Sequence, residues 1–380
     1  MENLLMISTL FFPMAALAAP GQDASQSAWR VYVVTYTGGS SEGIYVMEFD
    51  SGTGALLEPR LAAAMENPSF LTVHPEMRVL YAVGEAGAAG GVVSAYQIDS
   101  ATGALTLINS QPSLGDGPCH VAVSPLAKHV AVANYGGGSI SLYPITAGGG
   151  LEKSSAFVQH EGSGPDPKRQ EGPHAHAVYF DAAGHYLYVA DLGLDKVMIY
   201  DYDAEAGSLT PHDPPFVSLD AGAGPRHVAF HPRGFAYVVN EMGNTVSAFA
   251  HDASKAVWTL IESVSTLPAG YNTYSTTAEI EVHRSGRFLY ASNRGHDSIA
   301  VFGVDEKTGK LTAIEHTLTE GKTPRHFALD PSGGYMLVAN QESDSVVVFR
   351  VDAERGTLAA TEQRVEVGAP VCLVFVPKGK

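Results

Sequence analysis

The chain has 380 residues, of which 45% are hydrophobic and only 17% are charged, and it contains 40 glycines and 22 prolines. These turn-forming residues are spread along the whole length, which favours an all-β protein of many short strands over a helical one. The formal net charge of −17 argues against nucleic acid or an anionic membrane surface as a partner, because both would repel such a surface. A local basic pocket for an anionic substrate is still compatible with this charge.

Residues 1–19, MENLLMISTLFFPMAALAA, have the pattern of a secretory signal peptide, and a polar linker follows over 20–29. Glu2 stands where a lysine or arginine is usual, which a mis-assigned start codon or an uncleaved anchor would explain. We expect a periplasmic or secreted protein, or a cytoplasmic one if the start is mis-assigned. No later stretch is apolar and long enough to span a bilayer, so the mature chain is expected to have no membrane span.

From residue 30 onward the sequence repeats one unit. Each copy has a short alternating strand, a turn, a second strand that ends near an asparagine, a third strand of the Ser-Val-x-x-Phe type, and a weaker fourth strand. Alternation of period two with β-branched and aromatic residues predicts strands. In chain order the clearest copies begin at NPSFLTVHP (67–75), GPCHVAVSP (117–125), GPHAHAVYF (172–180), GPRHVAFHP (224–232), AEIEVHRSG (278–286) and TPRHFALDP (323–331).

Equivalent residues near the start of the first strand mark the copies and lie 46 to 57 residues apart: Ser69, Cys119, His176, Arg226, Ala278, Arg325 and Val371. Seven such marks predict an all-β, seven-bladed β-propeller with four antiparallel strands in each blade. The segment 30–57 lacks a first strand, and 369–380 supplies only a first strand. The two ends are therefore expected to share one blade of a single domain, 30–380, which removes a free sheet edge.

The two cysteines, Cys119 and Cys372, have no metal-binding spacing. The repeat places them two blades apart, so we expect no disulfide between them.

In such a blade the start of the first strand and the end of the second lie at the same mouth of the ring, because the two strands are antiparallel. The second strands end at Tyr36, Glu85, Tyr135, Leu192, Glu241, Arg294 and Gln341. One sector of the mouth should then gather His176, Arg226, Glu241, Arg294 and Arg325, with Glu85 and Tyr135 across from them. The alternative is that these charges form ion pairs that only tie the blades together.

His174 and His176 stand two residues apart in GPHAHAV, as paired metal ligands can. No third ligand lies in a matching motif, and nearby arginines would repel a cation, so we expect no metal site and no other cofactor. We expect His176 to reach the mouth and His174 to lie on its rim.

The motifs GPHAHAV, GPRHVAFHP, VVNE and ASNRGHDSI occur in order at matching blade positions. In these motifs the chain resembles the propeller lactonase family, which includes 6-phosphogluconolactonases and carboxy-cis,cis-muconate lactonizing enzymes. The resemblance implies hydrolysis of a sugar lactone, such as gluconolactone or 6-phosphogluconolactone, to the open acid. Together with the signal peptide it suggests a periplasmic gluconolactonase-like branch. The family's proposed catalytic groups correspond here to His176, Arg226, Glu241 and Arg294.

Ring opening of a lactone needs an activated water and donors for the carbonyl oxygen as it becomes an oxyanion. Either Glu241 or His176 fits the role of base, and Arg226 and Arg294 fit the carbonyl or a substrate anion. The remaining candidates for substrate binding are His174, Arg325, Glu85, Tyr135 and Gln341. The alternatives to a hydrolase are a muconate-type lactonizing cycloisomerase and a non-catalytic propeller that binds a ligand or protein at its mouth.

Overall fold

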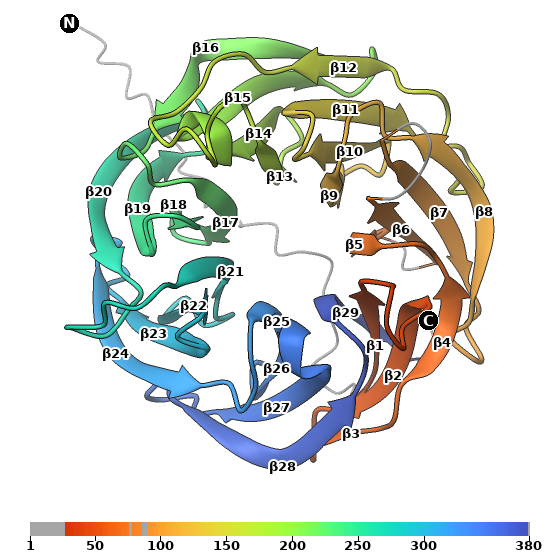
Figure 1. The fold of residues 1–380 in the computed structure, drawn as a ribbon. Coiled ribbons are helices and arrows are strands. Elements are labelled where there is room, and N and C mark those ends of the chain that lie inside the picture. Colours follow the sequence, from red (N-terminus) through yellow and green to blue (C-terminus); the bar gives the residue numbers. More distant parts are fainter. Residues whose placement is uncertain (1–26, 76–77, 86–89, 379–380) are drawn as a thin grey trace, which may run out of the picture.

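The computed structural model describes residues 27–75, 78–85 and 90–378. In these residues seven antiparallel sheets stand around a common centre, each with its first strand innermost (Figure 1). The predicted seven-bladed propeller is therefore confirmed. The predicted signal peptide, 1–19, and most of the linker over 20–29 lie outside the described residues. Within the described residues, no helix has the length and apolar character needed to cross a membrane.

Six of the sheets are built from four consecutive strands. The first three contain β5 (Pro68–Val73), β6 (Val79–Gly84), β7 (Val92–Ile98) and β8 (Leu105–Pro112), then β9 (Pro118–Val123), β10 (His129–Asn134), β11 (Ser139–Pro144) and β12 (Ala156–Gln159), then β13 (Ala175–Phe180), β14 (Tyr186–Asp191), β15 (Lys196–Asp203) and β16 (Ser208–Ser218). The next three contain β17 (Pro225–His231), β18 (Phe235–Asn240), β19 (Thr245–Asp252) and β20 (Val257–Ser265), then β21 (Thr276–Val282), β22 (Phe288–Arg294), β23 (Ser298–Val304) and β24 (Leu311–Leu318), then β25 (Pro324–Leu329), β26 (Tyr335–Asn340), β27 (Ser345–Val351) and β28 (Leu358–Glu366).

The seventh sheet joins the two ends of the chain, as the sequence predicted. Its strands follow the order β29 (Pro370–Pro377), β1 (Ala28–Thr35), β2 (Gly43–Asp50) and β3 (Ala55–Leu56), and β4 (Arg60–Ala64) also pairs with β2. The pairing of β1 with β29 runs from Trp29 opposite Pro377 to Val34 opposite Cys372. Because β29 supplies the missing first strand, the inner edge of β1 is paired.

The core lies between neighbouring blades, where the alternating strands pack their apolar faces together. A recurring contact links four of the blades to the next: a buried tyrosine donates its hydroxyl to a glycine carbonyl in the turn before the following blade's fourth strand. Tyr237 reaches Gly309 in this way at 3.1 Å, and Tyr290 reaches Gly356 at 2.9 Å. The glycines adopt positive φ, and a Cβ at Gly309 would come within 2.6 Å of the ring of Phe235, so only glycine fits there.

Each inner strand carries a β-bulge at its mouth end. In β13 the register jumps between Ala175 and Ala177, which leaves His176 as the extra residue, and in β17 the same shift leaves Arg226 extra. The shift recurs in the other five blades and falls on the marked residue each time: Ser69, Cys119, Ala278 with Glu279, Arg325 and Val371. A bulge re-aims the extra side chain away from the regular alternation. The side chains of the marked residues therefore depart from the in–out alternation of the strand at the mouth of the ring.

Candidate active site

The mouth of the ring holds a pocket of about 350 Å³ where bulged residues of the inner strands meet the ends of the second strands. Its lining comprises Tyr36, Glu85, Gly117, Cys119, Tyr135, Gly136, Arg169, His176, Glu241, Arg294 and Arg325. The structure thus brings together six of the nine residues proposed from the sequence: His176, Glu241, Arg294, Arg325, Glu85 and Tyr135.

Glu241, the residue after β18, is buried at the centre of a cluster of guanidiniums. Its Oε2 lies 3.2 Å from Nε of Arg226 and 2.9 Å from Nη2 of Arg294. Its Oε1 accepts a hydrogen bond of 2.6 Å from Nη2 of Arg169. Burial by itself would raise the pKa of Glu241, but the surrounding arginines outweigh it and lower the pKa to about 2. The carboxylate is therefore charged at neutral pH, with both oxygens engaged.

Arg226 stands behind the pocket wall with only 4% of its side chain exposed. Its Nη1 donates to the carbonyl oxygen of Ala278 in the next blade at 2.7 Å and lies 3.2 Å from Nε2 of His227. The other ring nitrogen of His227 lies 3.0 Å from the Glu279 carboxylate. Burial, and after it the charges of Arg294 and Arg325, lower the pKa of Arg226 to about 10, so it remains a cation at neutral pH. These contacts fix its guanidinium against Glu241.

His176 is a buried residue of the pocket lining with a ring nitrogen that is free to form a hydrogen bond. Among the described residues its Nδ1 has no hydrogen-bond partner, although only 5% of the residue is exposed. Its ring lies 5.5 Å from that of Tyr135 and 5.3 Å from that of His227. Burial first, and then the charge of Arg226, lower the pKa of His176 well below its usual range. The imidazole is therefore neutral at physiological pH and can accept a proton.

His174, predicted to lie on the rim and to bind substrate, is not in the pocket lining but packs against one of its walls. Its ring stacks on Tyr135, with centroids 4.6 Å apart and planes 21° apart, and its Nδ1 lies 2.9 Å from the Tyr135 carbonyl oxygen. Tyr135 in turn lines the pocket. His174 thus holds a wall of the pocket in place.

The opposite wall is a chain of hydrogen bonds across the closing blade. Nη2 of Arg325 donates to the Tyr36 hydroxyl at 3.0 Å, and that hydroxyl donates to Oε1 of Glu85 at 2.7 Å. Tyr36 directly follows the second strand of the closing blade, β1. The sequence predicted it at the mouth without giving it a role. Burial raises the pKa of its hydroxyl, so it stays a neutral donor and acceptor.

Arg169 is a pocket residue that sequence reasoning missed. It comes from the loop between β12 and β13, and its Nη2 bonds both Glu241 and, at 3.1 Å, the Tyr135 hydroxyl. A signal was present: the repeat is longest, at 57 residues, between Cys119 and His176, and the extra residues include the basic pair Lys168 and Arg169.

A sequence model of the family described as "Lactonase, 7-bladed beta-propeller" matches residues 30–375. The chain belongs to this lactonase family. It is 42% identical over 301 residues to the 6-phosphogluconolactonase of Bacillus subtilis (strain 168), covering 79% of this chain and 84% of that protein. It is 35% identical over 303 residues to the 6-phosphogluconolactonase of Formosa agariphila, covering 76% and 82%.

A solved structure gives a second comparison. The periplasmic gluconolactonase PpgL of Pseudomonas aeruginosa superposes with a TM-score of 0.88 at 36% identity, covering 92% of this chain and 99% of that one. These comparisons confirm the resemblance to propeller lactonases.

Gln341, like Arg226 and His174, is a predicted residue that is not in the pocket lining. Instead of ending β26, it opens a 3₁₀ turn, η2 (Gln341–Ser343), and its backbone N–H donates to the carbonyl of Thr323 at 2.9 Å. Leu192 similarly opens η1 (Leu192–Leu194) and is fully buried.

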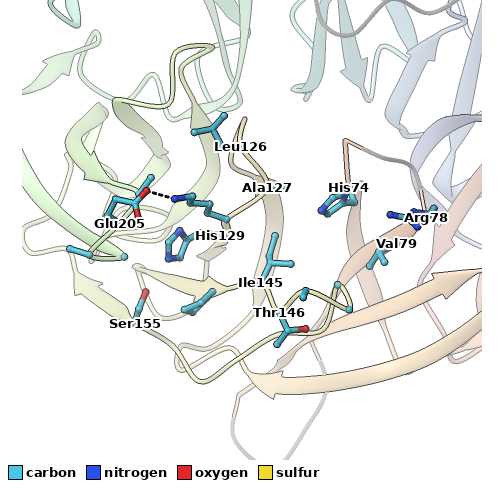
Figure 2. A pocket seen from close by; sticks show the side chains of 18 of the residues that line it. His74, Arg78, Val79, Leu126, Ala127, His129, Ile145, Thr146, Ser155 and Glu205 are labelled. Carbon is cyan, nitrogen blue, oxygen red and sulfur yellow. Dashed lines mark hydrogen bonds and ion pairs between the residues drawn. The ribbon is translucent and has the colours of Figure 1, made fainter.

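A larger cavity of about 730 Å³ lies away from this site, among turns such as those at His74, Ala127 and Gly207 (Figure 2). Its charged groups are partnered: Lys128 forms an ion pair with Glu205, and Nδ1 of the buried His129 lies 2.7 Å from the Tyr202 hydroxyl. It therefore lacks the unpartnered buried base found at the mouth, and the smaller pocket is the candidate active site.

Neither cysteine is part of a disulfide: Cys119 and Cys372 are both free thiols and both buried. Burial is also the main cause that raises the pKa of the Cys119 thiol, to about 12, so this pocket residue is not a thiolate nucleophile at neutral pH. Within the described ranges, no three or more His, Cys, Asp or Glu side chains gather as metal ligands.

Proposed function

We propose that the mouth pocket hydrolyses the ring ester of a sugar lactone, with His176 as the base. The observation that carries this proposal is the buried imidazole of His176, whose Nδ1 has no partner among the described residues and which lines the same pocket as Arg294 and Arg325. The relatives named 6-phosphogluconolactonase and the periplasmic gluconolactonase support this substrate class over the ring-forming reaction of the muconate enzymes.

In this mechanism the neutral imidazole of His176 takes a proton from water as the water oxygen bonds to the lactone carbonyl carbon. The carbonyl oxygen becomes an oxyanion beside the guanidiniums of Arg294 and Arg325, whose positive charges stabilise it. The bond between the carbonyl carbon and the ring oxygen then breaks, and the proton on His176 passes to the leaving ring oxygen. The product is the open hydroxy acid.

The positive surroundings that make His176 a weak base in the free enzyme change during the reaction. Arg226 and Arg325 disfavour an imidazolium as long as no further negative charge forms on a substrate in the pocket. An oxyanion forming among the same cations offsets their charge, so protonation of His176 becomes easier as the transition state is reached. Proton transfer and oxyanion formation therefore favour each other.

Glu241 is assigned a different role, although the sequence alone left it as a possible base. Its oxygens bond three guanidiniums, and a carboxylate with a pKa of about 2 has little tendency to take a proton from water. We assign it to holding Arg226, Arg294 and Arg169 in position. Tyr36, Glu85 and Tyr135 are assigned to the sugar hydroxyls.

The periplasmic location is part of this proposal. It is supported by the apolar run from Leu4 to Leu17 and by the Pseudomonas aeruginosa neighbour, whose name calls it periplasmic. Mass spectrometry of the protein from a periplasmic extract should find the mature chain beginning near residue 20. An intact N-terminus in the cytosolic fraction would contradict export.

The activity is tested by following hydrolysis of glucono-δ-lactone, a galactonolactone and 6-phosphogluconolactone, each measured above its spontaneous rate. We expect at least one lactone to be opened with saturable kinetics. A purified, folded protein that accelerates none of them would overturn the proposed function.

A further inference from the structure

The loop between β12 and β13, residues 160–174, is fastened to the next blade by buried hydrogen bonds. Nδ1 of His160 lies 2.6 Å from Oδ2 of Asp191. The Gln170 side chain donates to the carbonyl of Leu192 at 2.8 Å and to Oδ1 of Asp195 at 2.7 Å. Gln170, Asp191 and His160 are all nearly inaccessible to solvent. The loop is therefore a fixed part of the blade rather than a loose connection.

The fastening delivers one side chain to the pocket, that of Arg169. The carboxylate of Asp166 accepts hydrogen bonds from the backbone N–H groups of Lys168 and Arg169, at 2.8 and 3.1 Å, which sets the turn just before Gln170. Arg169 then reaches Glu241 and Tyr135 through Nη2 alone. Among the described residues the Nε and Nη1 groups of its guanidinium have no such protein partner, so they remain available to a ligand.

Arg169 also differs from the strand-borne arginines in exposure. Its side chain is 36% exposed, against 4% for Arg226 and 15% for Arg294. It therefore bridges the buried carboxylate and the open side of the pocket, where the part of a substrate remote from the reacting ester would lie.

The charges of the pocket do not cancel. Arg169, Arg294 and Arg325 line it together with Glu85 and Glu241, and Arg226 stands directly behind Glu241. In the lining, three guanidiniums against two carboxylates leave an excess of one positive charge, in a protein whose formal net charge is −17. A neutral lactone would leave this excess uncompensated, whereas a lactone with an anionic substituent would complement it.

We propose that Arg169 is a specificity-determining residue that binds an anionic substituent, a phosphate or a carboxylate, on the lactone. The inference rests on the proposed lactonase function and deepens it. Nη2 keeps its bonds to Glu241 and Tyr135 while the Nε and Nη1 side of the planar guanidinium pairs with the anion. The fastened loop supplies the rigidity that such recognition needs.

The test compares Arg169→Gln with Lys168→Gln, which removes the same charge from the neighbouring exposed position of the same loop. The substrates are glucono-δ-lactone, 6-phosphogluconolactone and the monolactone of a sugar diacid. We expect Arg169→Gln to lower kcat/KM about ten- to hundredfold for one or both anionic lactones, mainly through KM, and less than about threefold for the neutral one. Lys168→Gln should stay within about twofold on all three, and Arg169→Lys should restore part of the preference.

The two anionic substrates show whether Arg169 binds a phosphate or a carboxylate. Only the lactone whose anion Arg169 binds should lose its higher kcat/KM relative to the neutral lactone in the Arg169→Gln variant. An equal loss on neutral and anionic lactones would mean that Arg169 acts only through Glu241, and it would overturn the proposal. So would a wild-type protein without preference for either anionic lactone.

A wild-type protein that hydrolyses no lactone would instead count against the proposed function. The role of Arg169 is then decided by calorimetry with the acids 6-phosphogluconate, glucarate and gluconate. Arg169→Gln should weaken the binding of 6-phosphogluconate or of glucarate about tenfold more than it weakens the binding of gluconate. Equal weakening of all three would overturn it.

Discussion

The inner strands have the same backbone arrangement in every blade, but the side chains at their two ends have different roles. At the end away from the mouth, the residue five positions after the mark caps a turn in five blades: Ser124, Asp181 and Asp330 accept backbone N–H groups of the turn that follows. His231 and His283 do the same and also reach a carbonyl oxygen of the next blade. Different side chains here perform one structural task.

At the mouth end the bulge frees the marked residue from the strand, and the contacts cross between blades. Glu241 of one blade holds Arg294 of the next, and Arg325 reaches Tyr36 of the closing blade. At the capped end, different residues perform one function in these five blades, whereas at the mouth different residues from several blades build a single pocket. Variation at equivalent positions of the repeats therefore indicates function only when the contacts show whether the different residues share a structural role or a pocket.

Among substitutions that distinguish the mouth end of the inner strands from the capped end, Arg226→Ala is expected to have the largest effect on activity. The substitution removes a buried cation from Glu241 and a donor from the Ala278 carbonyl, so kcat/KM should fall about 10²- to 10³-fold. The matched change at the capped end, His231→Ala, should lower the free energy of unfolding by about 1–3 kcal/mol and leave kcat/KM within about twofold. Equal losses of activity in both variants, each shown to be folded, would break the comparison.

His176→Ala should lower kcat about 10²-fold or more, because it removes the proposed proton acceptor. Its effect is expected in kcat rather than KM, and circular dichroism should show a native fold. Steady-state kinetics on the best lactone provides the measurement. If His176→Ala left kcat nearly unchanged while His174→Ala lowered it strongly, the role of base would have to be assigned to His174 instead.

His174→Ala is expected to act more mildly, because the ring supports Tyr135 from behind the pocket. KM should rise about three- to tenfold while kcat stays within about twofold. This split sharpens the distinction between a residue that contacts the reacting atoms and one that positions a wall. A fall in kcat as large as that for His176→Ala would remove the distinction.

The smallest expected effect is that of pH near neutrality. The folded-state pKa of His176 lies well below 6.5, so the catalytically required neutral imidazole persists as the pH falls from 8 to 6.5. The enzymatic kcat/KM, corrected for spontaneous hydrolysis, should be flat in this window and decline only at lower pH. An acid limb centred near 6.5 would show that His176 titrates as an ordinary exposed histidine.

The propeller and the sector of the mouth follow from the sequence because both depend on position in a repeat. His176 and Arg226 occupy equivalent places, so one alignment locates both. Arg169 could not be predicted in this way, because its loop is held in place by hydrogen bonds to Asp191 and Asp195, which belong to the next blade. Gln341 has the right repeat position, but a 3₁₀ turn begins there. The different charge behaviour of His176 and Glu241 depends on burial and neighbouring arginines, which no linear pattern records.

The pairing of β29 with β1 also bears on how the protein is made. One wall of the pocket joins Arg325 to Tyr36, and the blade that carries Tyr36 receives its innermost strand last. A nascent chain still lacking β29 has an open edge on β1 and an incomplete ring. We expect such ribosome-bound chains to have no lactonase activity, and translation stalled before and after residue 377 would test this. Catalysis would then begin only after the ring has closed, so that turnover itself reports completed assembly.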